Sequence, residues 1–314
     1  MSGLSYIDAA TVLQLLTPQA AVEAITGALL AGVDPAGGPP RSAVPTTAGE
    51  YLIMPAEAGP VTGVKVLTVA PDNPSHGRAR IQGVYALFDA QYLHPIALMD
   101  AVSITNLRTP AVSISAILPL VKSLAGKVVN VVAFGTGPQG QGHVRTLLPF
   151  VGSIRVTYVS RGKPGDLDDF PGTQVSWLAA SSAELPQRIA QADVVFAATS
   201  AATPLFDSAL IAPGTIVVAV GSHDRGHREL DSALLARSQV VVEDLATAVR
   251  EAGDVVLALA EDAIREADLI TLAGVATGKA ELDASKVTVF KSTGMAWEDL
   301  VVADAVYQRW LAGR

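Results

Sequence analysis

The chain has 314 residues, 50% of them hydrophobic and 17% charged, which is enough material for two domains with a sizeable core. Its net charge of −8 argues against a nucleic-acid or anionic-membrane partner, and the absence of cysteine excludes disulfides, thiolate metal sites and cysteine nucleophiles. No basic segment precedes an apolar core at the N-terminus, and no uninterrupted apolar run is long enough to span a membrane, so we expect a soluble, cytoplasmic protein.

The beginning of the chain predicts helices followed by an antiparallel sheet. Apolar residues with helical spacing begin after Asp8, and Pro18 divides them into two helices. Short strand-like runs follow with turn-rich segments between them, a spacing that favours antiparallel pairing. These runs cover residues 51–54, 61–69 and 81–89. Residues 102–124 predict a long apolar helix, bent near Pro110 or Pro119.

Three cations in this region, Arg41, Lys65 and Arg108, are candidate ligands for an anion. Lys65 interrupts a strand that otherwise predicts burial, and a buried ammonium is costly unless an anion compensates it. The alternative is a lysine on the solvent-facing side of the strand. Arginine supplies bidentate contacts to carboxylates, so three converging cations would form a site for a substrate carboxylate.

The segment from Val128 to Gly140 predicts a dinucleotide site. A β-branched run, residues 128–134, predicts a buried parallel strand, and helical sequence begins at Gln141. Between them lies a G-x-G-x-x-G motif, whose glycines allow a tight turn, close approach of a pyrophosphate and packing of helix on strand. Proline is suited to the first turn of a helix because it lacks only an N–H that has no partner there. The predicted cofactor contacts in this loop are Gly135, Thr136, Gly137, Pro138 and Gln139.

The next strand, residues 154–159, bears on the choice of cofactor. An NAD-preferring fold places an acidic residue at the end of this strand, to bind the ribose 2′-hydroxyl. Here Ser160, Arg161 and Lys163 occupy the corresponding place. We therefore expect NADP(H) to be favoured over NAD(H), with these side chains meeting the 2′-phosphate; a solvated basic loop is the alternative.

The remaining strands complete a doubly wound α/β sheet. Runs of apolar residues cover 192–199, 213–220, 239–242 and 286–290, and an amphipathic helix is expected over 297–310. Open α/β sheets bind ligands at the carboxyl ends of their strands. We therefore expect further cofactor contacts from Thr199, Ser200, Val220, Gly221 and Ser222. No pair of histidines has metal-ligand spacing with a carboxylate partner, so no metal is predicted.

Several segments together resemble the ornithine cyclodeaminase and mu-crystallin superfamily over nearly the whole chain. The order and spacing of these segments carry the resemblance. They are Gly63-Val-Lys-Val66, Pro71-Asp-Asn-Pro74, Ile104-Thr-Asn-Leu-Arg-Thr109, Gly135-Thr-Gly-Pro-Gln139, Ala192-Asp-Val-Val195, Ala198-Thr-Ser200, Pro213-Gly-Thr215, Glu229-Leu-Asp231, Phe290-Lys-Ser-Thr-Gly294 and Glu298-Asp299.

The resemblance implies a fold, a cofactor and a substrate class. It implies a Rossmann domain, residues 119–294, inserted in a discontinuous α+β domain for substrate binding and dimerisation, residues 1–118 plus 295–314. It implies NAD(P)-dependent chemistry at the α-carbon of an amino or imino acid, a homodimer, and a substrate carboxylate held by Arg41, Lys65 and Arg108. Thr109 and Lys291 lie in matching segments and join the expected cofactor contacts.

One departure from the family pattern affects the predicted reaction. Ornithine cyclodeaminases carry a catalytic aspartate at the position that corresponds to His223, and the nearest aspartate here is Asp224. In an extended segment, a shift of one residue points a side chain to the opposite face. Ring closure with loss of ammonia is therefore in doubt. His223 is a candidate proton donor, and a solvent-facing loop histidine is the alternative.

The resulting hypothesis is NAD(P)H-dependent reduction of a small cyclic imino acid, such as Δ1-pyrroline-2-carboxylate or Δ1-piperideine-2-carboxylate. Lys65 or an ordered water would relay the proton that the imine needs. One alternative is ornithine cyclodeamination with Asp224 in place of the missing aspartate, or amino-acid dehydrogenation. Another is an NADPH-dependent protein that binds a small ligand without catalysis, although such a protein has no need of three carboxylate-binding cations.

Overall fold

The computed structural model describes residues 4–313, and the chain divides into two compact units. Within the described residues, the first unit comprises 4–112 and 295–313, and the second comprises 113–294. The chain thus enters and leaves the second unit once, as an insertion does. The sequence placed the first boundary slightly later, after residue 118. No helix within 4–313 is long and apolar enough to cross a membrane.

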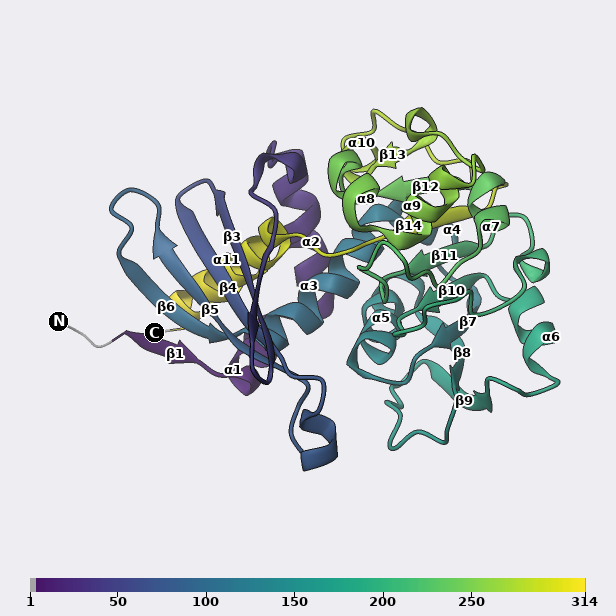
Figure 1. Ribbon diagram of the computed structural model, residues 1–314, viewed down its shortest axis with the longest axis horizontal. Helices are drawn as coiled ribbons and strands as arrows, with labels where there is room; N and C mark the ends of the chain where they lie inside the picture. The colour runs from purple at the N-terminus through teal and green to yellow at the C-terminus, as the bar shows by residue number, and fades with distance from the viewer. Residues whose placement is uncertain (1–3, 314) are drawn as a thin grey trace. The chain divides into compact units, whose positions relative to one another are not determined.

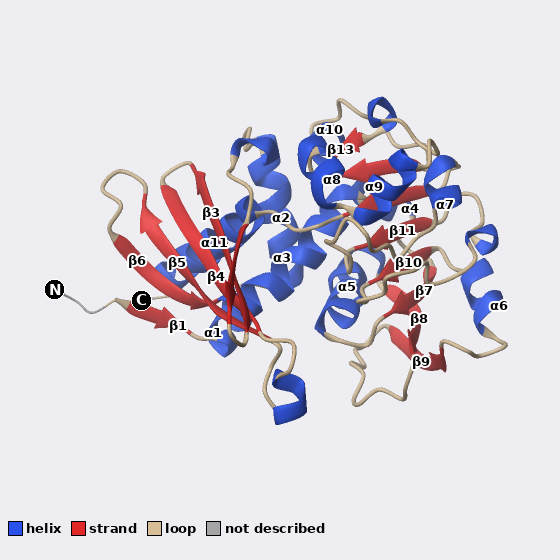
Figure 2. Ribbon diagram, viewed as in Figure 1, coloured by secondary structure: helices blue, strands red, loops and turns tan. Residues whose placement is uncertain are grey.

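A six-stranded sheet forms the first unit, in the order β1-β6-β5-β4-β3-β2 (Figures 1 and 2). β1 and β6 pair in parallel, and the other neighbours pair antiparallel. β4 and β5 have the predicted bounds, whereas β1, β2 and β6 were not predicted. The strands are β1 (Ser5–Ile7), β2 (Ser42–Thr46), β3 (Gly49–Ala58), β4 (Val61–Val69), β5 (Ile81–Asp89) and β6 (Pro95–Asp100).

Helices pack against this sheet, and the C-terminal helix α11 (Ala296–Ala312) contacts β3, β4 and β5. Burial alternates along β4, so Val61, Gly63, Lys65 and Leu67 are the buried positions. Two N-terminal helices, α1 (Ala9–Leu15) and α2 (Pro18–Leu30), also contact α11. Thr17 caps α2 through a bond from the Ala20 N–H, and Pro18 begins the helix, where its lack of an N–H costs nothing.

Two further helices lead from the first sheet to the second. They are α3 (Ala101–Ala116) and α4 (Leu118–Ser123), separated at Ile117. Pro110 lies inside α3 without ending it, and Pro119 lies in the first turn of α4. The predicted single helix is therefore two helices, divided next to the second proline.

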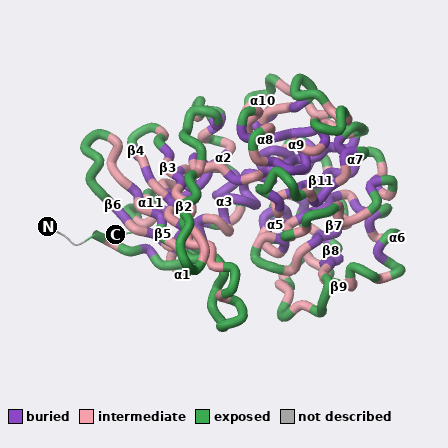
Figure 3. Tube along the Cα trace, in the orientation of Figure 1, coloured by how far each residue is buried: buried purple, intermediate pink, exposed green. Residues whose placement is uncertain are grey.

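The second unit is built on an eight-stranded parallel sheet, in the order β13-β12-β14-β11-β10-β7-β8-β9 (Figure 2). Its central strands are fully buried (Figure 3). The sequence predicted six of the strands and missed β9 and β13. The strands are β7 (Val128–Phe134), β8 (Ser153–Ser160), β9 (Thr173–Ala179), β10 (Val194–Ala197), β11 (Ile216–Ala219), β12 (Gln239–Val242), β13 (Ile270–Thr271) and β14 (Thr288–Lys291).

Helices cover both faces of this sheet. On one face, His143 of α5 packs against the ring of Phe196 in β10. On the other, Val195 and Ala197 of the same strand join a core with residues of α6 to α9. The helices are α5 (Pro138–Val151), α6 (Leu185–Ala190), α7 (Ser232–Ala236), α8 (Leu245–Glu251), α9 (Gly253–Ala260) and α10 (Leu272–Ala276); short 3₁₀ turns are η1 (Pro35–Gly37), η2 (Asn73–His76), η3 (Ser208–Leu210) and η4 (Glu266–Asp268).

The order of the strands identifies the edge where a ligand binds. The chain begins at β7, moves outward to β8 and β9, and then returns to β10 on the other side of β7. Parallel sheets bind ligands outside the carboxyl ends of the two strands where the winding reverses. These ends are Phe134 of β7 and Ala197 of β10, so a ligand is expected against the loops that follow them.

Candidate functional site

The first unit buries an ion cluster around Lys65. The Lys65 ammonium is 2.7 Å from the carboxylate of Asp299 on α11, and both side chains are almost completely buried, at 1% and 0% exposed. Lys65 Nζ also donates to the hydroxyl of Thr105 on α3, at 3.4 Å. Lys65 therefore lies in the interior, as predicted, and its counter-ion within the protein is Asp299.

Arg108 extends this cluster. Its Nη1 is 2.7 Å from Glu298 Oε2, and its Nε is 3.3 Å from Asp299 Oδ1. Two cations thus face two adjacent carboxylates, and the cluster is neutral as a whole. The family resemblance implied that Lys65 and Arg108 share a site, and the structure places both against the same Asp299. Arg41 lies directly before β2 and is half-buried, so its part in a carboxylate site remains a prediction.

Burial changes the acidity of Lys65. The pKa of its ammonium is lowered from 10.5 to about 8, chiefly because burial removes the charge from water and also because Arg108 is nearby, while Asp299 and Glu298 oppose the shift. Tyr85, opposite Lys65 in the β4–β5 ladder, is also buried, and burial raises the pKa of its hydroxyl. A lysine with a pKa near 8 gives up a proton far more readily than an ordinary lysine, and such a group is suited to general acid catalysis.

The second unit carries the glycine loop between β7 and α5. Gly135 has φ +103°, and a Cβ there would collide with the carbonyl oxygen of Ala198. A Cβ on Gly140 would collide with the carbonyl oxygen of Gly135, so this glycine lets α5 approach the loop. At Gly137, by contrast, a Cβ would meet nothing within 4 Å. The first and third glycines therefore shape the turn, and the second faces open space.

That open space fits a pyrophosphate. Gly137 is the N-cap of α5, with no side chain that accepts the first N–H groups, and Pro138 begins the helix. The N–H groups at the start of a helix and the helix dipole favour an anion at this end. Gly137 and Pro138 are exposed, and Thr136 and Gln139 are half-buried. These residues fit the phosphate groups of a dinucleotide, which is the role that the sequence predicted.

The loop after β8 presents two exposed cations, Arg161 and Lys163. The Ser160 hydroxyl is engaged within the unit, because it donates to the Gly162 carbonyl at 2.6 Å and accepts from Trp177 Nε1 at 2.8 Å. The two cations are therefore the stronger candidates for a phosphate contact. Ser160 contributes mainly to the shape of the turn.

The loops after β10 and β11 contain the other predicted cofactor contacts. Thr199 and Val220 are half-buried and Ser200 is exposed, whereas the hydroxyl of the buried Ser222 donates to the His227 carbonyl at 2.7 Å. Gly221 donates its N–H to Glu229, so its backbone is fixed. A cofactor contact from these residues stays a prediction.

The two candidate catalytic residues of this unit lie in an exposed loop after β11. His223 and Asp224 are both exposed. Asp224 Oδ1 accepts the Gly226 N–H at 2.8 Å, and the Asp224 carbonyl accepts the His227 N–H. Part of the Asp224 carboxylate is thus used to close its own turn. A catalytic role for either residue stays a prediction.

Lys291 and His143 are buried in the second unit and are held by contacts with other parts of the protein. Lys291 was expected to contact the cofactor, but its side chain is fully buried, paired with Asp254 at 2.8 Å and donating to the Ser222 carbonyl at 2.7 Å. His143 contacts the Gln139 carbonyl through Nδ1 and the Ser113 hydroxyl through Nε2, and burial lowers its pKa to about 4. His143 is therefore neutral and serves packing.

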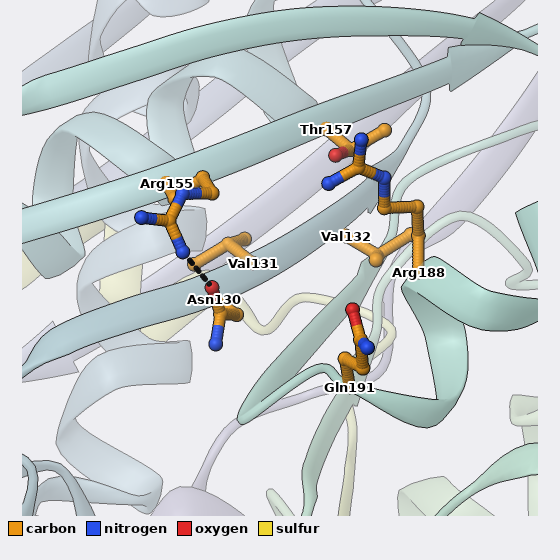
Figure 4. Close-up of a pocket in the computed structure, with 7 residues that line it drawn as sticks. All are labelled: Asn130, Val131, Val132, Arg155, Thr157, Arg188 and Gln191. Atoms are coloured by element: carbon orange, nitrogen blue, oxygen red, sulfur yellow. Dashed lines mark hydrogen bonds between the residues drawn. The ribbon is translucent and has the colours of Figure 1, made fainter. Parts of the chain in front are cut away.

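A cavity of about 320 Å³ opens on the face of the sheet between β7, β8 and α6. Figure 4 shows Arg155 bonded to Asn130 at one side of it and Arg188 with Gln191 at the other. None of the residues that line it belongs to the glycine loop, residues 135–140. The cavity therefore lies away from the glycine loop and is not the dinucleotide site. Within 4–313 no group of three or more acidic or histidine side chains is placed to hold a metal ion.

A parallel doubly wound sheet with a glycine loop at its switch point defines a dinucleotide-binding protein. The insertion of this unit into the chain of the first unit distinguishes the protein from dinucleotide-binding proteins whose domains follow one another. The chain belongs to the ornithine cyclodeaminase/mu-crystallin family, whose model matches residues 8–314. It is 30% identical over 266 residues to Δ1-pyrroline-2-carboxylate reductase of Colwellia psychrerythraea, covering 82% of this chain and 83% of that protein.

Two further relatives extend this comparison. Ketimine reductase mu-crystallin of Mus musculus is 31% identical over 281 residues, covering 88% of this chain and 86% of that protein. The structure of the iminosuccinate reductase of Paracoccus denitrificans in complex with NAD⁺ has a TM-score of 0.81 at 25% identity, covering 99% of this chain and 97% of that one. All three relatives are named as reductases.

Sequence reasoning missed Glu298 and Asp299 as site residues, although it used them as part of the family pattern. The available signal was the position of two adjacent acids between Trp297 and Leu300 at the start of an amphipathic helix. Two acids next to each other cannot both face away from the core when the residues on either side of them are buried.

Proposed function

We propose that this protein reduces a small cyclic imino acid, of the Δ1-pyrroline-2-carboxylate or Δ1-piperideine-2-carboxylate type, to the cyclic amino acid. The observation that carries the proposal is the buried Lys65 ammonium, which has a pKa of about 8 and lies beside Arg108. The reductases among the family relatives support the same substrate class. The reduced nicotinamide cofactor supplies the hydride, and the loops of the second unit hold it.

The charges of the first unit suit an imino acid in its reactive form. A protonated imine carrying a carboxylate is a zwitterion, and the cluster of Lys65, Arg108, Glu298 and Asp299 is neutral with both signs present. Lys65 and Arg108 would hold the substrate carboxylate, and Arg41 would add to them. Lys65 would give the neutral imine nitrogen the proton that makes it a protonated imine, whose carbon then accepts the hydride. Because its pKa is lowered, Lys65 can exist as a neutral amine near neutral pH after it has given up this proton.

The test is the loss of absorbance of reduced cofactor with the two cyclic ketimine carboxylates, using NADPH and NADH in parallel. We expect rapid ketimine-dependent oxidation. Ornithine with NAD⁺ is the control, because release of ammonia and proline would instead assign cyclodeamination and a role for Asp224. Tight binding of cofactor and ketimine with no oxidation would point to the non-catalytic binding protein.

We also propose that the cofactor is NADP(H) in preference to NAD(H). Arg161 and Lys163 are exposed after β8, and the sequence places no acidic residue between Ser160 and Lys163 to bind a ribose 2′-hydroxyl. Replacing both cations with alanine should weaken NADPH binding by about 10- to 100-fold, because two charge-assisted contacts to the 2′-phosphate are lost. NADH binding should remain nearly unchanged. The measurement is titration of NADPH and of NADH into the wild type and the double variant. Equal weakening of NADPH and NADH binding would contradict the assignment.

We propose a cytoplasmic homodimer as the working form. Large apolar side chains are exposed on the sheet of the first unit, and such a surface is typical of an interface. They are Tyr6, Val44, Tyr51, Ile81 and Val84. Light scattering of the purified protein should give twice the monomer mass, and a monomer at micromolar concentration would refute the dimer.

A further inference from the structure

Glu229 is a buried carboxylate that joins the ends of two neighbouring strands. It lies in the chain after β11 and is 0% exposed. One of its oxygens, Oε1, accepts the N–H and the hydroxyl of Thr199, both at 2.7 Å. The other, Oε2, accepts the N–H of Gly221 at 2.7 Å. Thr199 follows β10 and Gly221 follows β11, so one side chain fixes the backbone at both strand ends.

The local packing is built around this contact. A Cβ on Gly221 would collide with the Thr199 carbonyl oxygen and with Glu229 Oε1. Only glycine lets the two strand ends come close enough for one carboxylate to bridge them. A glutamine at position 229 would present an NH₂ group to either Gly221 or Thr199, both of which are donors. The side chain at position 229 therefore needs a hydrogen-bond acceptor toward Gly221 and another toward Thr199.

A second layer of buried charges holds Glu229 in place. Asp254 Oδ1 accepts the N–H groups of Glu229 and Leu230, each at 2.8 Å. Asp254 Oδ2 pairs with Lys291 of β14, whose Nζ donates to the Ser222 carbonyl. The network thus connects three consecutive strands of the sheet, β10, β11 and β14, on the side of their carboxyl ends.

We propose that Glu229 is a positioning residue for the cofactor, and that it acts through the backbone of Thr199 and Gly221. This inference rests on the proposed function, because the predicted cofactor contacts include both residues. Glu229 has no exposed atom with which to touch a ligand. Its effect is to hold the two loops in their binding conformation before the cofactor arrives, which removes an ordering cost from binding. Lys291 belongs to the same network and influences the cofactor only through Ser222 and Asp254.

The chain offers a matched control at the same side of the sheet. Glu243, which follows β12, is 3% exposed and accepts the Ser292 hydroxyl at 2.6 Å and the Thr293 N–H at 2.9 Å. It also accepts the Gly294 N–H at 3.1 Å. Glu243 is therefore an equally buried carboxylate with similar bonds, but none of these three partners is a predicted cofactor contact. Loss of either carboxylate should reduce thermal stability.

The experiment compares binding of NADPH and NADH, measured by the fluorescence of the reduced nicotinamide, in the wild type and in the E229Q and E243Q variants. We expect E229Q to raise both dissociation constants by about tenfold or more, the size of effect of a lost hydrogen bond to a charged group. E243Q should leave them nearly unchanged. At saturating cofactor, the KM for the imino acid should not change in E229Q. If E229Q does not fold, E229D, which keeps the charge on a shorter side chain, should show a smaller rise.

Two results would overturn the inference and are distinguishable from each other. If E229Q or E229D binds cofactor as the wild type does, or if E243Q weakens binding as much as E229Q, then Glu229 serves stability alone. If the wild type binds neither NADPH nor NADH, then the proposed function fails and the positioning role fails with it.

Discussion

Replacing Lys65 with methionine should lower kcat/KM for a cyclic ketimine by about 10²–10⁴-fold, the usual contribution of a group that transfers a proton in the transition state. Methionine fills most of the volume of the lysine stem but removes the ammonium that pairs with Asp299. The variant loses both a carboxylate contact and the proton donor of lowered pKa. The measurement is steady-state oxidation of reduced cofactor at several ketimine concentrations.

Two controls separate chemistry from folding and from charge. Binding of reduced cofactor should be nearly unchanged in K65M, because the predicted cofactor contacts other than Thr109 lie in the second unit. K65R keeps the positive charge, but arginine does not release a proton near neutral pH. We therefore expect K65R to recover part of the affinity for the substrate and little of the turnover. Full turnover in K65M would remove Lys65 from the mechanism.

Local patterns predicted the sheet of the second unit well. Two strands have the predicted bounds, Val128–Phe134 and Gln239–Val242. A continuous β-branched run bounded by polar residues is typical of a strand buried on both faces of a parallel sheet. The glycine loop was equally predictable, since Gly135 and Gly140 are fixed by contacts with backbone atoms a few residues away or on the neighbouring strand.

Edge strands were harder to predict from the same patterns. β9 is an edge strand that is half-exposed along its length, and β13 has only two residues. β2 is an exposed edge strand that contains Pro45. Such strands lack the apolar alternation that burial imposes, and proline argues against a central strand. The information that places them is the neighbouring strand, which a local window does not contain.

The ionic contacts of the site were the least predictable part. Lys65 and Asp299 are far apart in sequence, and nothing near Lys65 identifies its partner. The same holds for Lys291, which lies in a matched segment but points into the interior toward Asp254. A charged residue within an apolar strand indicates that a partner exists, but only the tertiary fold supplies it.

Replacing Asp299 with asparagine should destabilise the protein in a way that depends on pH. At neutral pH it leaves Lys65 and Arg108 buried with less negative charge, and loss of one partner of a buried pair costs about 3–5 kcal/mol of unfolding free energy. The pKa of Lys65 is about 8 in the fold against 10.5 for an ordinary lysine, and the variant should lower the folded value further. Between these two pKa values the unfolded chain binds more protons, so the unfolding free energy rises with pH.

The deficit of D299N should therefore be largest below pH 8 and smaller toward pH 10, where Lys65 is neutral in the fold and no longer needs a counter-ion. It should not vanish, because Arg108 stays charged. Urea unfolding of wild type and D299N across this pH range measures the loss of unfolding free energy. The matched control is D304N, because Asp304 lies on the same helix and is half-exposed. In turnover, the alkaline limb of kcat/KM should move to lower pH in D299N. A deficit independent of pH, with an unmoved limb, would show that Asp299 does not set the charge state of Lys65.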